Sequence, residues 1–185
     1  AFKVAVSRTR MERARLGKAV TCTALDGRRL GEKGLPPELS GSFDSAFVDA
    51  PCSGTGTLRR HPEIAWALQE PAIRTAGQSL PALQLELLRA ASTRVGAGGT
   101  LAYATCSELR QENEGVVSAF LAGQEGAAFS LVSPRSTAAF AALPPQAQRL
   151  VTAMIGPDGM VRTSRVDTPE LPLDGHFLAL LVREA

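Results

Sequence analysis

Two stretches of the sequence, Phe43-Asp-Ser-Ala-Phe-Val-Asp-Ala-Pro-Cys52 and Thr100-Leu-Ala-Tyr-Ala-Thr-Cys-Ser107, share one layout: a strand-like apolar run that leads into a cysteine. The segment between them has room for one strand–helix–strand crossover, the connection that links two parallel strands. In open α/β sheets, ligands bind outside the carboxyl ends of such strands. The sequence therefore predicts that Asp49, Cys52 and Cys106 meet at one edge of a parallel sheet, together with Asp26 at the end of a third predicted strand.

The region after Cys52 carries a helix pattern. Apolar residues recur at three- and four-residue spacing from Leu80 to Val95, which predicts a helix with one buried face, and the glycines at 96, 98 and 99 end it. Further along the chain, we expect helices around residues 116–121 and 145–155 and a last strand over His176–Val182. Helices that alternate with strands in this way are typical of an α/β fold.

The N-terminal region is expected to begin with a short strand at Phe2–Val6, an arginine-rich helix at Ser7–Leu16 and a second strand at Ala19–Leu25. Residues 31–42 and 53–75 are expected to be irregular. Together these elements predict one α/β domain over residues 1–185, with a mostly parallel sheet flanked by helices. Cys22, in the middle of a predicted strand, is expected to lie in the core.

The composition limits the classes of protein to which this chain can belong. With 185 residues and 44% hydrophobic content the chain fits a single globular domain, and its net charge of +2 is too small to indicate nucleic-acid binding by itself. The sequence shows neither a membrane-spanning run nor a signal-peptide layout. Its three cysteines lack metal-type spacing, so no metal is expected and a reduced, cytoplasmic setting is the simplest interpretation.

The residues at the strand ends match one chemistry. A lone cysteine is usually a small buried hydrophobe, and an Asp before Gly or Pro is usually a turn former. Two thiols and a carboxylate together, however, are what methylation of carbon 5 of cytosine needs. A thiolate adds to carbon 6, a carboxyl beside ring nitrogen 3 offsets the developing charge, and a second thiol helps product release.

The same residues carry a resemblance to the Sun-family RNA cytosine-5 methyltransferases. Asp49-Ala-Pro-Cys-Ser-Gly-Thr-Gly56, followed by Arg59-Arg-His-Pro-Glu-Ile-Ala-Trp66, resembles the first cysteine motif of that family, and Leu101-Ala-Tyr-Ala-Thr-Cys-Ser107, followed by Glu112-Asn-Glu114, resembles the second. Further matches occur in the family's order at Arg15-Leu-Gly17, Asp26-Gly-Arg28, Gln84 and Asp174-Gly-His-Phe177. The resemblance covers nearly the whole chain.

This resemblance implies a Rossmann-like fold, S-adenosyl-L-methionine as cofactor, and RNA as substrate, with ribosomal RNA favoured over transfer RNA. It implies Cys106 as the nucleophile, Cys52 as the residue that assists release, and Asp49 as a contact to the cytosine ring and the cofactor pocket. Asp26 and Gly27 would bind the cofactor. Arg59, Arg60 and His61 would lie beside the target nucleotide. A monomer is expected.

Departures from the family pattern concern the N-terminal side. The glycine-rich cofactor segment, Ala-Pro-Gly-Gly-Lys in the family, does not occur here, and Val4-Ala5-Val6 runs into Ser7 where an acidic residue binds the ribose. We therefore expect a catalytic domain whose N-terminal unit is absent from this chain.

One alternative is a non-catalytic RNA-binding relative that has lost the cofactor. Another is a cysteine hydrolase that uses Cys52 or Cys106 with His61. Trp66 is expected to be a core residue.

Overall fold

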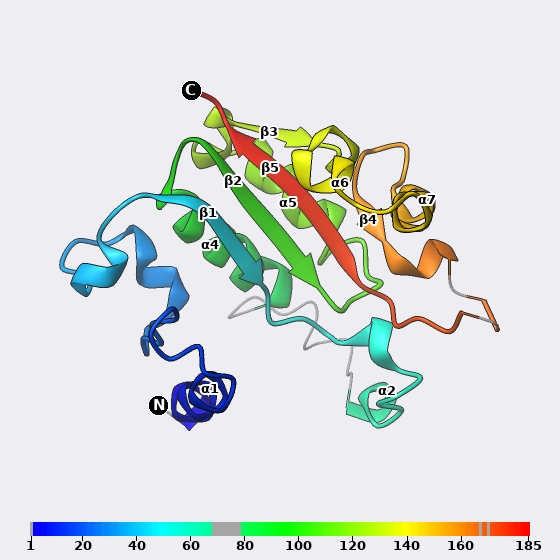
Figure 1. Cartoon of the computed structure of the whole chain (residues 1–185), viewed down its shortest axis with the longest axis horizontal. Helices are drawn as coiled ribbons and strands as arrows, with labels where there is room; N and C mark the ends of the chain where they lie inside the picture. Colours follow the sequence, from blue (N-terminus) through cyan, green and yellow to red (C-terminus); the bar gives the residue numbers. More distant parts are fainter. Residues whose placement is uncertain (1, 68–78, 167, 170) are drawn as a thin grey trace.

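The computed structural model describes residues 2–67, 79–166, 168–169 and 171–185. Within these residues the chain forms a five-stranded sheet with helices packed on it (Figure 1). The strands are β1 (Phe43–Asp49), β2 (Val95–Thr105), β3 (Phe129–Val132), β4 (Val161–Arg162) and β5 (Phe177–Arg183). The helices are α1 (Phe2–Arg13), α2 (Ile64–Ala67), α4 (Leu80–Ser92), α5 (Glu114–Leu121), α6 (Ala138–Ala141) and α7 (Pro145–Met154). None of the helices in this part of the chain is long and apolar enough to cross a membrane.

The sheet has the order β1-β2-β5-β3, with β4 paired to β5. Strands β1 and β2 are parallel, whereas β5 runs antiparallel to β2, β3 and β4. The prediction of an α/β fold is confirmed, but the described sheet is mixed rather than mostly parallel. The reason is that β5 enters between β2 and β3 in the opposite direction, so all its pairings are antiparallel.

Two N-terminal predictions are wrong. Residues 2–6, expected as a strand, form the first part of helix α1, and residues 19–25, expected as a second strand, form no strand. A strand satisfies its backbone N–H and C=O groups only through neighbouring strands, whereas a helix satisfies them internally. The expected parallel neighbours of β1 are therefore missing from the described sheet, and β1 lies at its edge.

Most of the other elements lie where the sequence predicts them. Helix α4 begins after Ser79, whose hydroxyl accepts a hydrogen bond from the Ala82 N–H at 3.4 Å, and Pro81 occupies its first turn. The helix ends earlier than predicted, because Val95 already belongs to β2. Helices α5 and α7 and strand β5 match the predicted positions. Part of the segment 53–75, predicted to be irregular, forms α2, and residues 68–75 lie outside the described residues.

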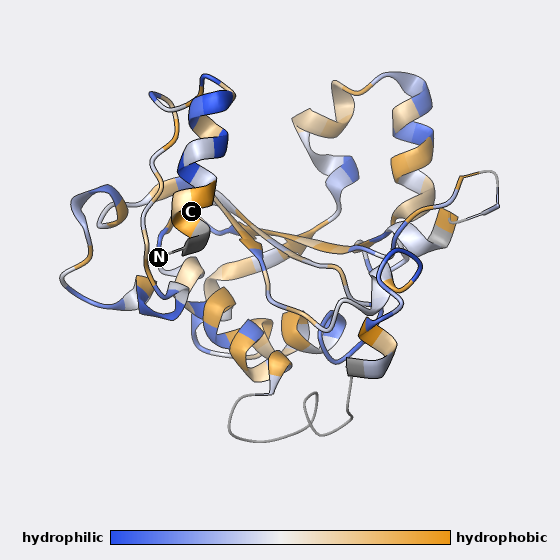
Figure 2. Cartoon of the chain, turned by 90° about the horizontal axis from the view of Figure 1, so that it is seen from below, coloured by the Kyte–Doolittle hydropathy of each residue, from blue (hydrophilic) through white to orange (hydrophobic). Residues whose placement is uncertain are grey.

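The core lies between the sheet and the helix pair α4–α5. Figure 2, in which the sheet is seen nearly edge-on, shows helices on both of its sides. Fully buried apolar side chains from α4, β2, α5 and β5 pack together, and they include Leu88, Leu101, Val117, Phe120 and Leu181. Each such side chain contributes roughly 1.5–3 kcal/mol by burial. Strand β2 is part of this core, and β1 is attached to it through the parallel pairing and through the partly buried side chains of Ala46 and Val48.

Candidate active site

The two cysteine loops leave the sheet side by side. In the parallel register Asp49 lies opposite Ala104, and the Ala50 N–H donates to the Ala104 carbonyl at 3.0 Å. Beyond this point the sulfur atoms of Cys52 and Cys106 are 2.9 Å apart, and both thiols are free and half-buried. The structure thus brings together the cysteines that the sequence places at the ends of two strands.

Backbone contacts hold these sulfurs in place. The N–H of Cys106 donates to the sulfur of Cys52 at 3.2 Å, and the N–H of Gly56 donates to the carbonyl of Cys106 at 3.0 Å. Gly56 in turn lies so close to Gly175 that a Cβ atom on Gly56 would meet the Gly175 carbonyl oxygen at 1.9 Å. A glycine at this position is therefore required for the loop after Cys52 to dock beside β5.

The Cys106 thiol is held in its protonated form. Burial raises the pKa of Cys106 to about 12, and the hydrogen bond and negative charge of Cys52 act in the same direction, as does the charge of Asp49 to a smaller extent. A thiolate is the reactive form of cysteine. Cys106 can therefore attack a substrate only if its proton is removed during the reaction or its surroundings change when the substrate binds.

Asp49 ends β1 and is exposed. It lies at a cavity of about 330 Å³, which is within the usual size range of small-molecule sites. Apolar side chains of β1, α4 and the segment before β1 make up most of the wall, among them Leu30, Phe47, Val48 and Leu87. This cavity is suited to a flat, weakly polar group with a donor directed at the carboxylate.

The structure places Gly27 at this cavity, while Asp26 is engaged elsewhere. A Cβ atom on Gly27 would meet the Leu87 side chain at 2.9 Å, so this glycine leaves the cavity open next to α4. The carboxylate of Asp26 accepts hydrogen bonds from the Arg28 guanidinium, the shortest at 2.6 Å, and from the Arg28 N–H at 3.1 Å. These contacts lower the pKa of Asp26 to about 2. Asp26 is therefore a charged group whose partner is Arg28.

The basic stretch after Cys52 is tied to a carboxylate. Arg59 donates to Asp174 at 3.3 Å, and Arg60 forms a second ion pair with the same side chain. Arg60, followed by Arg59, lowers the pKa of Asp174. His61 contacts Glu63 at 3.1 Å, and no hydrogen bond joins it to either cysteine among the described contacts. This separation weighs against a cysteine–histidine hydrolase.

Two further predictions about single residues are wrong. The side chain of Trp66, expected in the core, is 86% exposed on the short helix α2. Cys22 is only half-buried, and it lies outside any strand. Among the described residues, no group of three His, Cys, Asp or Glu side chains is placed to hold a metal ion.

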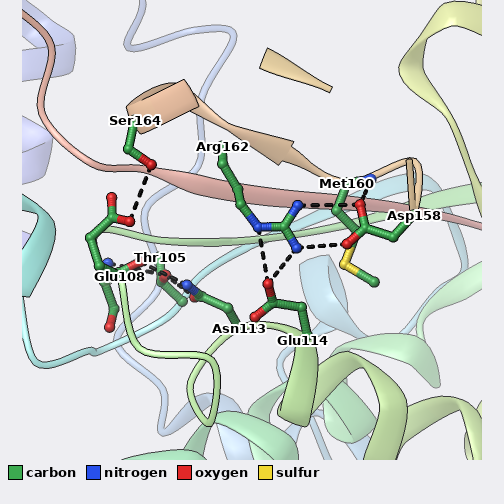
Figure 3. A network of polar contacts seen from close by, with 9 residues as sticks. Thr105, Glu108, Asn113, Glu114, Asp158, Met160, Arg162 and Ser164 are labelled. Carbon is green, nitrogen blue, oxygen red and sulfur yellow. Dashed lines mark hydrogen bonds and ion pairs between the residues drawn. The ribbon is translucent and has the colours of Figure 1, made fainter. Parts of the chain in front are cut away.

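Sequence reasoning gave no role to a buried polar network behind the cysteines. The network consists of four buried residues, Ser53, Gln84, Ser107 and Glu112. Next to it, Figure 3 shows Arg162 between the carboxylates of Glu114 and Asp158; its guanidinium reaches Asp158 at 2.7 Å. The signal in the sequence was the acidic pair Glu112 and Glu114 shortly after Cys106, but a sequence does not show which of the two is buried.

Comparison with known proteins decides the family. A model of the 16S rRNA methyltransferase RsmB/F family matches residues 3–163. The chain belongs to the RsmB/F family. Over 118 residues, or 63% of its length, it is 42% identical to ribosomal RNA small subunit methyltransferase B of Salmonella agona. It spans only about a quarter of the length of such relatives, covering 25% of this one.

Solved structures with a similar fold also match this member of the RsmB/F family. A methyltransferase homolog protein from Pyrococcus horikoshii superposes with a TM-score of 0.58 and 24% identity, over 96% of this chain and 50% of the other. NSun6 from Pyrococcus horikoshii, solved with SFG, superposes with a TM-score of 0.54 and 22% identity, over 94% of this chain and 39% of the other. The mixed sheet and its flanking helices therefore share their fold with these two proteins.

Proposed function

We propose that residues 1–185 are a catalytic domain that methylates carbon 5 of cytosine in RNA with S-adenosylmethionine as the methyl donor. The observation that carries this proposal is the pair of thiols, 2.9 Å apart, beyond the ends of two parallel strands with Asp49 on the same edge. Membership of an rRNA methyltransferase family makes ribosomal RNA the favoured substrate, with transfer RNA second.

In the proposed reaction, the Cys106 thiol loses its proton, its sulfur adds to carbon 6 of the cytosine, and the electron pair of the ring double bond makes carbon 5 a nucleophile. The proton passes to Asp49, which shares it with ring nitrogen 3 as negative charge develops in the ring. Because the charge of Asp49 raises the pKa of Cys106, uptake of the proton by Asp49 removes that contribution and favours the thiolate.

Cys52 completes the cycle. After carbon 5 has gained the methyl group, it still carries its original hydrogen. Cys52 accepts this proton, the bond between carbon 6 and the Cys106 sulfur breaks, and the electron pair of that bond returns to Cys106 as a thiolate. The sulfur atoms of Cys52 and Cys106 are only 2.9 Å apart, so when Cys106 is bonded to carbon 6, Cys52 lies close enough to reach the neighbouring carbon 5. Both sulfurs must therefore face the same base.

The cavity beside Asp49 fits the adenosyl part of the proposed cofactor. Its wall is mainly apolar, Gly27 leaves room next to Leu87, and Asp49 contributes a carboxylate. We infer that Gly27 and Asp49 hold this group, and that Asp26 joins them once its ion pair with Arg28 opens. S-adenosylmethionine would supply an electrophilic methyl group. NSun6, a protein with a similar fold, was solved with SFG, a ligand related to this cofactor.

An RNA base reaches such a site only when it leaves its stack, so a loop or an opened helix is the expected substrate. Arg59, Arg60 and His61 follow Cys52 on the same loop, and we infer that they contact the phosphates next to the target. Arginine contacts to phosphate position a nucleic acid without reading its sequence.

The test measures transfer of a labelled methyl group to small-subunit ribosomal RNA, with transfer RNA as the comparison. Cys106→Ala should abolish both methylation and any covalent protein–RNA adduct. Cys52→Ala should accumulate the adduct, because the proton on carbon 5 is no longer removed. Cys22→Ala is the matched control and should behave as wild type. An adduct in Cys106→Ala but none in Cys52→Ala would reverse the two roles.

One observation favours a second candidate, an RNA-binding protein without cofactor. The carboxylate of Asp26 is fully engaged by Arg28, at distances down to 2.6 Å. Isothermal titration with S-adenosylmethionine separates the candidates, because only the methyltransferase requires binding. RNA binding with no heat of cofactor binding, in both wild type and Arg28→Ala, would favour the second candidate.

A further inference from the structure

Glu112 is a carboxylate with no exposed surface, and it lies directly behind the two cysteine loops. A buried carboxylate is costly unless hydrogen bonds compensate for the water it has lost. Four donors surround this one. They are the Ser53 N–H at 3.0 Å, the Ser53 hydroxyl at 2.5 Å, the Gln84 side-chain amide at 3.1 Å and the Ser107 hydroxyl.

The donors come from the two cysteine loops. Ser53 directly follows Cys52, and its N–H belongs to the peptide bond that joins the two residues. Ser107 directly follows Cys106. Gln84 also donates to the Pro51 carbonyl at 2.9 Å, just before Cys52. The carboxylate therefore binds the backbone directly after Cys52, reaches the Pro51 carbonyl through Gln84, and binds the second loop through the Ser107 hydroxyl.

Neighbouring contacts make Glu112 itself rigid. Its carbonyl oxygen accepts the Tyr103 hydroxyl at 2.6 Å, so its backbone is bound to the buried strand β2. The following residue, Asn113, donates to the Ser107 carbonyl at 2.7 Å and accepts from the Thr105 hydroxyl at 2.6 Å. The side chain of Glu112 thus extends from a fixed point of the core to both loops.

We propose that Glu112 is a positioning residue that sets the relative position of the Cys52 and Cys106 sulfurs. The chemical consequence rests on the proposed function, because both sulfurs must then act on adjacent atoms of one base. A misplacement of about 1 Å in a reacting group can cost about 100-fold in rate. Glu112 touches neither the sulfurs nor the substrate, and it acts through Ser53 and Ser107.

The first test measures this geometry without any methylation assay. In a Cys22→Ser background, the protein is equilibrated with reduced and oxidised glutathione. Formation of the Cys52–Cys106 disulfide removes two protons and two electrons from the thiols and reduces one glutathione disulfide to two thiols. The equilibrium constant gives the effective concentration of one thiol near the other. We expect Glu112→Ala to lower it about tenfold or more.

A conservative replacement of Glu112 separates the effect of its hydrogen bonds from the effect of its negative charge. Glu112→Gln keeps an acceptor oxygen for the Ser53 N–H and the Gln84 amide. Its NH₂ group then faces the Ser53 and Ser107 hydroxyls, which can turn to accept. We expect this variant to remain within about threefold of wild type.

Two control variants lose a side-chain group outside the Glu112 network. Glu114→Gln removes a carboxylate two residues away that binds Arg162 instead of the cysteine loops. Leu88→Ala weakens the core and shows the effect of lower stability alone. Neither control should change the equilibrium constant by more than about twofold. An unchanged constant in folded Glu112→Ala overturns the proposal. If that variant does not fold, Ser107→Ala replaces it, and an unchanged constant there overturns the proposal equally.

A second readout links the geometry to the reaction. Glu112→Ala should lower kcat for methylation about tenfold or more while the Kd for RNA stays the same, because the residue contacts no substrate. An unchanged kcat with an active wild type overturns the proposal. If the wild-type protein shows no methylation at all, the proposed function fails, yet the glutathione equilibrium still decides the role of Glu112.

Discussion

Replacing Cys52 by alanine should make Cys106 easier to ionise. Burial is the largest cause that raises the pKa of Cys106 to about 12, and the hydrogen bond and charge of Cys52 are the next two. The substitution removes both contributions of Cys52 and leaves burial and the Asp49 charge in place. The pKa of Cys106 should therefore fall, but it should remain above the ordinary thiol value of 9.0.

The expected change in the alkylation rate of Cys106 follows from these pKa values. At about pH 8, a thiol with a pKa of about 12 is ionised in about one molecule in ten thousand, whereas one with a pKa of 9.0 is ionised in about one in ten. Each unit by which the pKa falls gives about tenfold more thiolate. A less basic thiolate is also less nucleophilic, so the net gain in alkylation rate is about threefold to fourfold per unit.

The assay follows alkylation of Cys106 by iodoacetamide between about pH 7 and pH 11, with residue-resolved mass spectrometry, since only the thiolate reacts. A Cys22→Ser background keeps the third cysteine out of the measurement. In the reference protein the rate should still rise at the upper end of this range, because the inflection near pH 12 lies above it, and the rate in Cys52→Ala should exceed the reference throughout the range. Equal rates in the two proteins, or an inflection in the reference protein near the ordinary thiol value of 9.0, would refute the reasoning.

Three other substitutions test the site and its support. Asp49→Asn should reduce methyl transfer about 100-fold or more with little change in Tm, because the exposed carboxylate acts on the base and not on the core; near-normal turnover would remove it from the mechanism. Leu88→Ala should lower the free energy of unfolding by about 2–5 kcal/mol in denaturant titrations, since its side chain is fully buried. Gly56→Ala should lower Tm and turnover because its Cβ would meet the Gly175 carbonyl at 1.9 Å, whereas Gly41→Ala, with nothing within 4 Å, should be neutral; equal effects would contradict this contact.

The sequence predicted the parts of the fold that local pattern decides. Strand β1, helix α4 and strand β2 follow from periodicity, breaking glycines and the length of the connection, and these three elements alone place Cys52 beside Cys106. The N-terminal segments differ from the prediction because a short apolar run can form either a strand or a helix. The outcome there depends on whether neighbouring strands exist to accept its hydrogen bonds.

The buried polar network behind the cysteines could not be predicted from the sequence, for a related reason. Glu112, Ser53 and Gln84 come from three segments, and only the packed structure shows that they share one buried point. A Glu in a sequence indicates a surface residue unless its partner is known, because charged residues are rarely buried without one. The direction of β5 was equally hidden, since an apolar run does not reveal which way it enters a sheet.

The surroundings of the two thiols support the proposed division of their roles. Cys106 follows β2 directly, between the buried residues Thr105 and Ser107, and its carbonyl is held by the Gly56 N–H. Cys52 lies on a loop beyond Pro51 and depends on Glu112 and Gln84 for its position. The group that forms a covalent bond needs the more rigid base, because the attacking atom must approach one ring carbon along one direction. The strand cysteine is therefore suited to attack, and the loop cysteine, which the Glu112 network holds beside it, is suited to release.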